Sequence, residues 1–80
     1  MHVEWNVLRF EGDRDLHVVE IVAGDCRIPQ ALYKQADYLF PDKERAAKMA
    51  EKTAKEAALF LGLKVKKVEH DYVQHPEVGA

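Results

Sequence analysis

Apolar and polar residues alternate along the first part of the chain with the period of two that is typical of β-strands. Residues 2–10 form the first predicted strand, and the alternation changes phase between Val7 and Leu8. This change predicts a β-bulge at that point. Residues 16–23 are rich in β-branched side chains and form a second predicted strand. The polar loop at 11–15 favours an antiparallel hairpin between the two strands.

Residues 27–40 fit two patterns. Pro29 suits the first turn of a helix, and Leu32 and Ala36 follow it at helical spacing. Alternate residues of the same segment also share one face of a strand, although Lys34 interrupts that face. We favour a helix or irregular structure, and a third strand of a meander remains the alternative.

Residues 42–61 have the clearest pattern, that of an amphipathic helix. Asp42 suits the N-cap and Gly62 the left-handed position after the last turn. The predicted apolar stripe consists of Ala46, Ala50, Thr53, Ala57 and Leu61, widened by Ala47, Met49, Ala54 and Phe60. Because most of these side chains are small, we expect the strands to supply the bulky partners, namely Trp5, Val7, Val19 and Ile21.

Residues 64–73 form the last predicted strand, whose lysines are typical of a sheet edge. Pro76 ends it, and residues 74–80 are expected to be a free tail. The pattern as a whole predicts one α+β domain over residues 1–80. It has an N-terminal antiparallel β-hairpin, one long amphipathic helix packed on the sheet, and a C-terminal edge strand.

Composition supports a single small globular domain, because 48% of the 80 residues are hydrophobic and 32% are charged. Cys26 is the only cysteine, so no intrachain disulfide can form, and we expect it to be half-buried. No apolar run is long enough for a membrane span, and the N-terminus does not resemble a signal peptide. These features predict a cytoplasmic protein.

Catalytic and metal-binding motifs are missing from the sequence. The four histidines do not have the spacing that places ligands on one face of a helix or in a zinc motif. Cys26 has no histidine close in sequence that could act as its base. We therefore predict no catalytic residue, no metal site and no cofactor.

Two binding functions remain. Nucleic-acid binding through the hairpin face would use Arg9, Arg14, Arg27, Lys64, Lys66 and Lys67. Acidic residues interrupt these basic positions and the net charge is −2, which argues against a general nucleic-acid binder. We therefore favour protein binding, with nucleic-acid binding as the alternative.

Protein binding has its own candidate residues, which are Trp5, Val19, Ile21, Leu59 and Tyr72. Leu59 falls on the charged side of the predicted helix, and tyrosine is enriched in interfaces. The second strand is apolar on both faces, but one helix covers only one of them. A helix within 29–40 or a second copy of the chain would cover the other face, so a homodimer is a further expectation.

Overall fold

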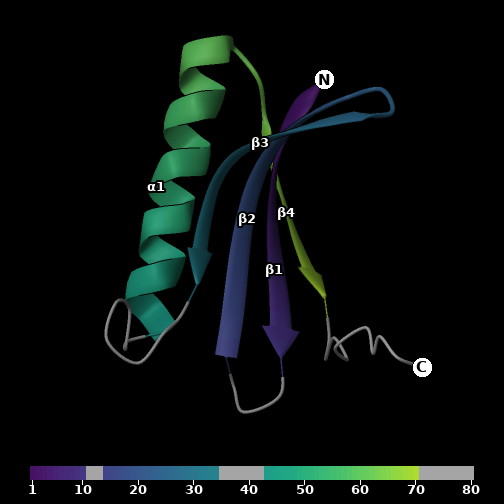
Figure 1. The fold of residues 1–80 in the computed structure, drawn as a ribbon. Coiled ribbons are helices and arrows are strands. Elements are labelled where there is room, and N and C mark those ends of the chain that lie inside the picture. Colours follow the sequence, from purple (N-terminus) through teal and green to yellow (C-terminus); the bar gives the residue numbers. More distant parts are fainter. Residues whose placement is uncertain (11–13, 35–42, 71–80) are drawn as a thin grey trace, which may run out of the picture.

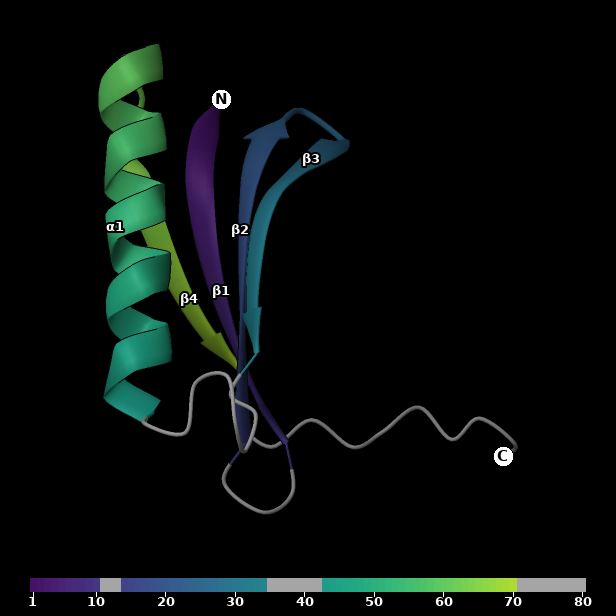
Figure 2. The same ribbon diagram turned by 60° about the vertical axis from the view of Figure 1, so that its left-hand side comes forward.

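The computed structural model describes residues 1–10, 14–34 and 43–70 (Figure 1). The elements are β1 (His2–Phe10), β2 (Arg14–Ala23), β3 (Cys26–Lys34), α1 (Lys43–Leu61) and β4 (Val65–His70). The strands form one sheet in the order β3-β2-β1-β4, in which β1, β2 and β3 pair antiparallel and β4 pairs parallel to β1. The helix lies across one face of this sheet (Figures 1 and 2). The predicted α+β architecture, with its hairpin and its edge strand, is confirmed.

The predicted bulge in the first strand is wrong. The pairing of β1 with β2 runs without interruption from His2 opposite Val22 to Phe10 opposite Arg14. Leu8 lies opposite Leu16, and both are half-buried. The alternation changes phase because this strand carries apolar side chains on both faces, and not because its register shifts.

The preference for a helix in the segment after Cys26 is also wrong, because β3 is the third strand of a meander. Its pairing with β2 contains the one irregularity of the described sheet. Ala31 lies opposite Val19 and Pro29 opposite Glu20, which leaves Gln30 as the extra residue of a bulge. Proline is tolerated there because β3 is an edge strand. Residues 35–40 lie outside the described part of the chain.

The helix packs its alanines onto the bulky side chains of the sheet, as the sequence predicts. Four alanines spaced one turn apart are buried, which are Ala46, Ala50, Ala54 and Ala58. Ala50, Ala54 and Ala58 join Val3, Trp5, Val7 and Val19 in one core cluster. Ala57 is only partly buried. The buried stripe therefore runs through Ala54 and Ala58, each one residue after the predicted Thr53 and Ala57. The assignments of Met49, Phe60 and Leu61 to the stripe are wrong, because all three side chains are exposed.

The end of α1 has the predicted glycine cap. Gly62 has a φ of 69°, and the Leu63 amide donates a hydrogen bond of 2.8 Å to the Ala58 carbonyl. The side chain of Leu63 packs against the core cluster. The predicted N-cap Asp42 and the predicted tail 74–80 lie outside the described residues.

The connection through α1 decides which residues can meet. It brings β4 beside β1, so that Trp5 lies opposite Lys67 and Val7 opposite Glu69. The start of β1, the start of β4 and the end of α1 consequently share one end of the molecule (Figures 1 and 2). The turn between β2 and β3 lies at the same end and curves away from the helix.

Candidate functional site

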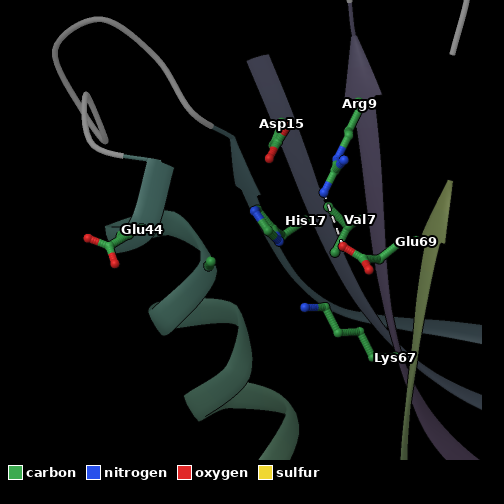
Figure 3. A pocket seen from close by; sticks show the side chains of 8 residues that line it. Val7, Arg9, Asp15, His17, Glu44, Lys67 and Glu69 are labelled. Carbon is green, nitrogen blue, oxygen red and sulfur yellow. Dashed lines mark hydrogen bonds and ion pairs between the residues drawn. The ribbon is translucent and has the colours of Figure 1, made fainter. Parts of the chain in front are cut away.

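A pocket of about 270 Å³ lies where the first turns of α1 meet the sheet (Figure 3). The strands contribute six lining residues, which are Val7, Arg9, Asp15, His17, Lys67 and Glu69. The helix contributes Glu44 and Ala47. In Figure 3 the Lys67 side chain reaches from β4 toward α1, whereas the Glu44 carboxylate points away from the strands. The pocket thus combines an apolar floor with charged walls.

His17 is the most buried polar side chain in this pocket, with 2% of its surface exposed. Its place on β2, opposite Val7, puts it beside Trp5 on the face that the helix covers. The Trp5 indole Nε1–H donates a hydrogen bond of 3.0 Å to His17 Nδ1. A neutral imidazole that accepts at Nδ1 carries its proton on Nε2. His17 Nε2 has no hydrogen-bond partner and is therefore an unused buried donor.

The protonation state of His17 follows from its surroundings. Burial lowers the pKa of His17 below its ordinary value of 6.5, Asp15 opposes this shift, and the positive charge of Lys67 adds to it. A second proton would have to sit on Nδ1, where it would break the hydrogen bond from Trp5. His17 is therefore neutral near pH 7 and acts as a donor, and its Nε2 lone pair is not available for a metal ion or as a general base.

Two cations stand at the wall of the pocket beside β4. Arg9 forms an ion pair with Glu69 at 3.1 Å, and both side chains are about half exposed. Lys67 Nζ lies 4.5 Å from the centroid of the Trp5 ring. Among the described residues, the ammonium of Lys67 has no carboxylate or hydrogen-bond partner. The lining of the pocket carries two cationic side chains, those of Arg9 and Lys67, and three carboxylates, those of Asp15, Glu44 and Glu69.

The face of the sheet away from the helix carries a second polar cluster, which extends over all four strands. Asn6 Nδ2 donates to Glu4 Oε2 and to Glu20 Oε1, each at 3.1 Å. Arg27 forms ion pairs with both of these carboxylates. His2 and His70 complete the cluster, with contacts to Glu4 at 3.4 Å and to Asn6 at 3.1 Å.

Hydrogen bonding within this cluster favours the ionised form of Glu4. The hydrogen bonds from Arg27 and Asn6 lower the pKa of Glu4 from 4.5 to about 2. Glu4 and Glu20 lie directly opposite each other in the sheet, and Arg27 bridges the two like charges. The side chains of the cluster are paired with one another.

The structure divides the six basic residues of the nucleic-acid hypothesis between two faces. Arg9 and Lys67 lie on the face toward the helix, and Lys66 and Arg27 lie on the opposite face with Glu4. Arg14 and Lys64 are exposed at different ends of the sheet. Arg9 and Arg27 are engaged with carboxylates. The described residues therefore do not combine the six into one basic patch.

The candidates for protein binding are also separated. Trp5 and Val19 lie in the core beneath α1, and Ile21 is partly buried against it. Leu59 is 85% exposed. Tyr72 lies outside the described residues.

Three consecutive exposed apolar residues end α1, and we call this group the apolar end: Leu59, Phe60 and Leu61. Three other large hydrophobic residues that are exposed lie on or beside separate strands: Met1, Ile28 and Val65. Sequence analysis identified Leu59 but assigned Phe60 and Leu61 to the buried stripe. Three consecutive apolar residues, 59–61, point in three directions around the helix, so one packed face cannot bury all of them. This run in the sequence is the signal that predicts exposed apolar side chains here.

Three further observations limit the chemistry of the chain. Cys26 is exposed, so the expectation that it is half-buried is wrong. Among the described residues, no three His, Cys, Asp or Glu side chains come together as a metal site requires. The described part of the chain also contains no helix that is both long enough and apolar enough to cross a membrane.

Comparison of the chain with protein-family models, with curated proteins and with solved structures finds no match.

Proposed function

We propose that this chain is a non-catalytic protein-binding domain that docks its partner on the apolar end. The observation that carries the proposal is the exposure of two large neighbouring side chains, Leu59 at 85% and Phe60 at 88%. Single exposed apolar residues are common on protein surfaces, but apolar groups that gather at one place mark interaction sites.

The energetics support an interface at this place. Burying a Leu or Phe side chain removes about 1.5–3 kcal/mol of unfavourable hydration. Leu59 and Phe60 stand on the last turn of a regular helix that is anchored by the Gly62 cap and by Leu63. A rigid helix end loses little conformational entropy when it binds, which leaves more of that gain for affinity.

The partner that fits is a protein with an apolar surface, and a second copy of the chain is one such partner. The exposed thiol of Cys26 supports a reducing compartment, so we place the interaction in the cytoplasm. The nucleic-acid alternative has less support, because Arg9 and Arg27 are already paired with carboxylates.

A matched pair of variants tests the proposal. The double variant Leu59→Lys/Phe60→Lys changes the apolar end, and Leu32→Lys changes an exposed leucine on β3 that lies outside it. Tagged proteins would be used to capture partners from lysate with and without nuclease, and light scattering after size exclusion would give the mass of each variant. We expect the double variant to lose its nuclease-resistant partner or its dimer mass, and Leu32→Lys to retain it.

Two outcomes would contradict the proposal. Equal capture and equal mass for both variants, with circular dichroism showing that both are folded, would exclude the apolar end as the interface. Retention on DNA or RNA that falls steeply with salt would instead favour nucleic-acid binding.

A further inference from the structure

We propose that the face of the sheet away from α1, which we call the open face, docks an acidic amphipathic helix of a partner protein. The open face shares no residue with the apolar end, and it does not depend on the docking proposed there. Two features of this face point to such an occupant: an aliphatic patch at its centre and a lysine at each of its two edges.

The aliphatic patch occupies two adjacent rows of the sheet. Side chains alternate between the two faces of a strand, so residues paired with Asn6 and Leu8 share their face. The patch consists of Leu8, Leu16, Val18, Leu32 and Val68. Leu32 is 61% exposed and the other four are half-buried, although no described helix or strand lies over this face (Figures 1 and 2). A solvated face of an antiparallel sheet normally carries polar side chains, so the patch indicates a face that a further layer covers.

The lysines give this face its uncompensated charge. Lys34 on β3 lies opposite Leu16, and Lys66 on β4 lies opposite Glu4. Both lysines are exposed, and within the described chain neither has a carboxylate partner. The two described carboxylates of the open face, those of Glu4 and Glu20, are ion-paired with Arg27. An occupant that complements this surface therefore carries carboxylates on both sides of an apolar stripe.

The dimensions of the open face suit one helix. Neighbouring strands lie about 4.8 Å apart, so four strands span about 14 Å, and a helix with its side chains is about 10–12 Å wide. α1 covers the other face of the same sheet in this way (Figures 1 and 2). In the register, Lys34 is level with His70, which places it about 13 Å from Lys66 along the strands. On a helix that follows the strands, this separation matches acidic residues about nine positions apart on opposite sides of the stripe.

Two other occupants fit these features less well. A second copy that packed its open face on this one would add lysines, whereas the described carboxylates of both copies are already paired with Arg27. A nucleic acid would complement the lysines, but the centre of the face is aliphatic, and single strands are bound by stacking their bases on aromatic side chains. The acidic amphipathic helix complements both the patch and the lysines.

The test uses a fluorescein-labelled synthetic helix of three heptads, with leucine at positions a and d and glutamate at positions e and g. A second peptide carries lysine in place of these glutamates. Fluorescence anisotropy with the full chain should show saturable binding of the acidic peptide in the micromolar range. The basic peptide should bind about tenfold more weakly or worse, because like charges then face each other. The double variant Lys34→Glu/Lys66→Glu should reverse this preference.

Matched variants locate the binding on the open face. Lys48→Glu/Lys52→Glu makes the same change of charge on the exposed side of α1 and should leave the preference unchanged. Leu32→Lys should abolish binding of the acidic peptide, whereas Leu59→Lys/Phe60→Lys should retain it. This reciprocal pair distinguishes a failure of the open face from a failure of the apolar end. Circular dichroism would confirm that each variant is folded.

Three outcomes would overturn the proposal. The first is equal affinity for the two peptides, or a preference that Lys34→Glu/Lys66→Glu does not change. The second is a dimer mass in light scattering that falls to the mass of one chain in Leu32→Lys, which would assign the open face to a second copy. The third is binding of a single-stranded oligonucleotide that is tighter than that of the acidic peptide and falls steeply with salt, which would assign this face to nucleic acid.

Discussion

The two faces of the sheet bury their side chains in different ways, although they alternate along the same strands. Trp5 and Glu4 are neighbours on β1 with opposite orientations, and each is 6% exposed. Trp5 is covered by the alanines of α1. Glu4 is covered by its own neighbours in the sheet, which are Asn6, Glu20 and Arg27.

This difference shows that burial alone does not indicate what stabilises a residue. The face toward the helix depends on the fit between large strand side chains and small helix side chains. The opposite face depends on the charges that its side chains carry and on the hydrogen bonds that satisfy them. Changes of shape should therefore damage the first face, and changes of charge or pH should damage the second.

The largest expected effect is that of Trp5→Ala, which removes the largest side chain of the core cluster. The cavity and the lost burial should lower the free energy of unfolding by about 3–5 kcal/mol, as measured by urea denaturation. Leu32→Ala on the open face serves as the control and should cost less than about 0.5 kcal/mol, because Leu32 is 61% exposed. Similar losses in both variants would mean that the helix does not shield Trp5.

Ala50→Leu should have the next largest effect. Ala50 is fully buried against the sheet, so the added methyl groups should overpack the interface and cost about 1–3 kcal/mol in thermal or urea unfolding. Lys48→Leu adds an apolar side chain on the exposed side of the same helix and should be nearly neutral. A Tm for Ala50→Leu that equals that of the natural chain would refute this packing.

Glu4→Gln tests the polar face. We expect a loss of about 1–2 kcal/mol at neutral pH, since charged hydrogen bonds to a partly exposed Arg27 are weakened. The control variant Glu69→Gln changes an exposed acid and should lower the free energy of unfolding much less.

The contribution of Glu4 should also depend on pH. Because folding lowers the pKa of Glu4 from 4.5 to about 2, its stabilisation is complete above about pH 4.5 and is lost as the pH falls toward 2. The difference in stability between the natural chain and Glu4→Gln should therefore shrink over that interval. A difference that is independent of pH would contradict the role of the ionised carboxylate.

The smallest expected effect is the pH dependence of stability that comes from His17, which is buried on the face of the sheet toward the helix. Burial lowers the pKa of His17 in the folded chain, so the folded state resists its protonation. Stability should be complete above pH 6.5 and should decline below it, toward the lowered pKa of the folded state. His17→Gln should abolish this decline, which urea unfolding at several pH values would detect. The two faces would then titrate in separate pH intervals.

Part of this structure could be predicted from local sequence patterns. The helical period identified the stripe around Ala50, and Gly62 marked the end of the helix. Alternation identified β1 and β2 and the side chains Trp5 and Val19 as core. These features depend on residues that are close together in the sequence. Their spacing decides which side chains share a face of the helix or of a strand.

The tertiary structure decided the remainder. Pro29 suits either the start of a helix or an edge strand. Only the pairing of its segment with β2 decided that this segment is the edge strand β3. Lys67 meets Trp5, and Asn6 meets His70, because the crossover through α1 puts β4 beside β1. His17 becomes an unused donor because Trp5 occupies its other nitrogen. Partners that lie more than ten residues apart are set by strand order and register, which residue spacing along the chain does not encode.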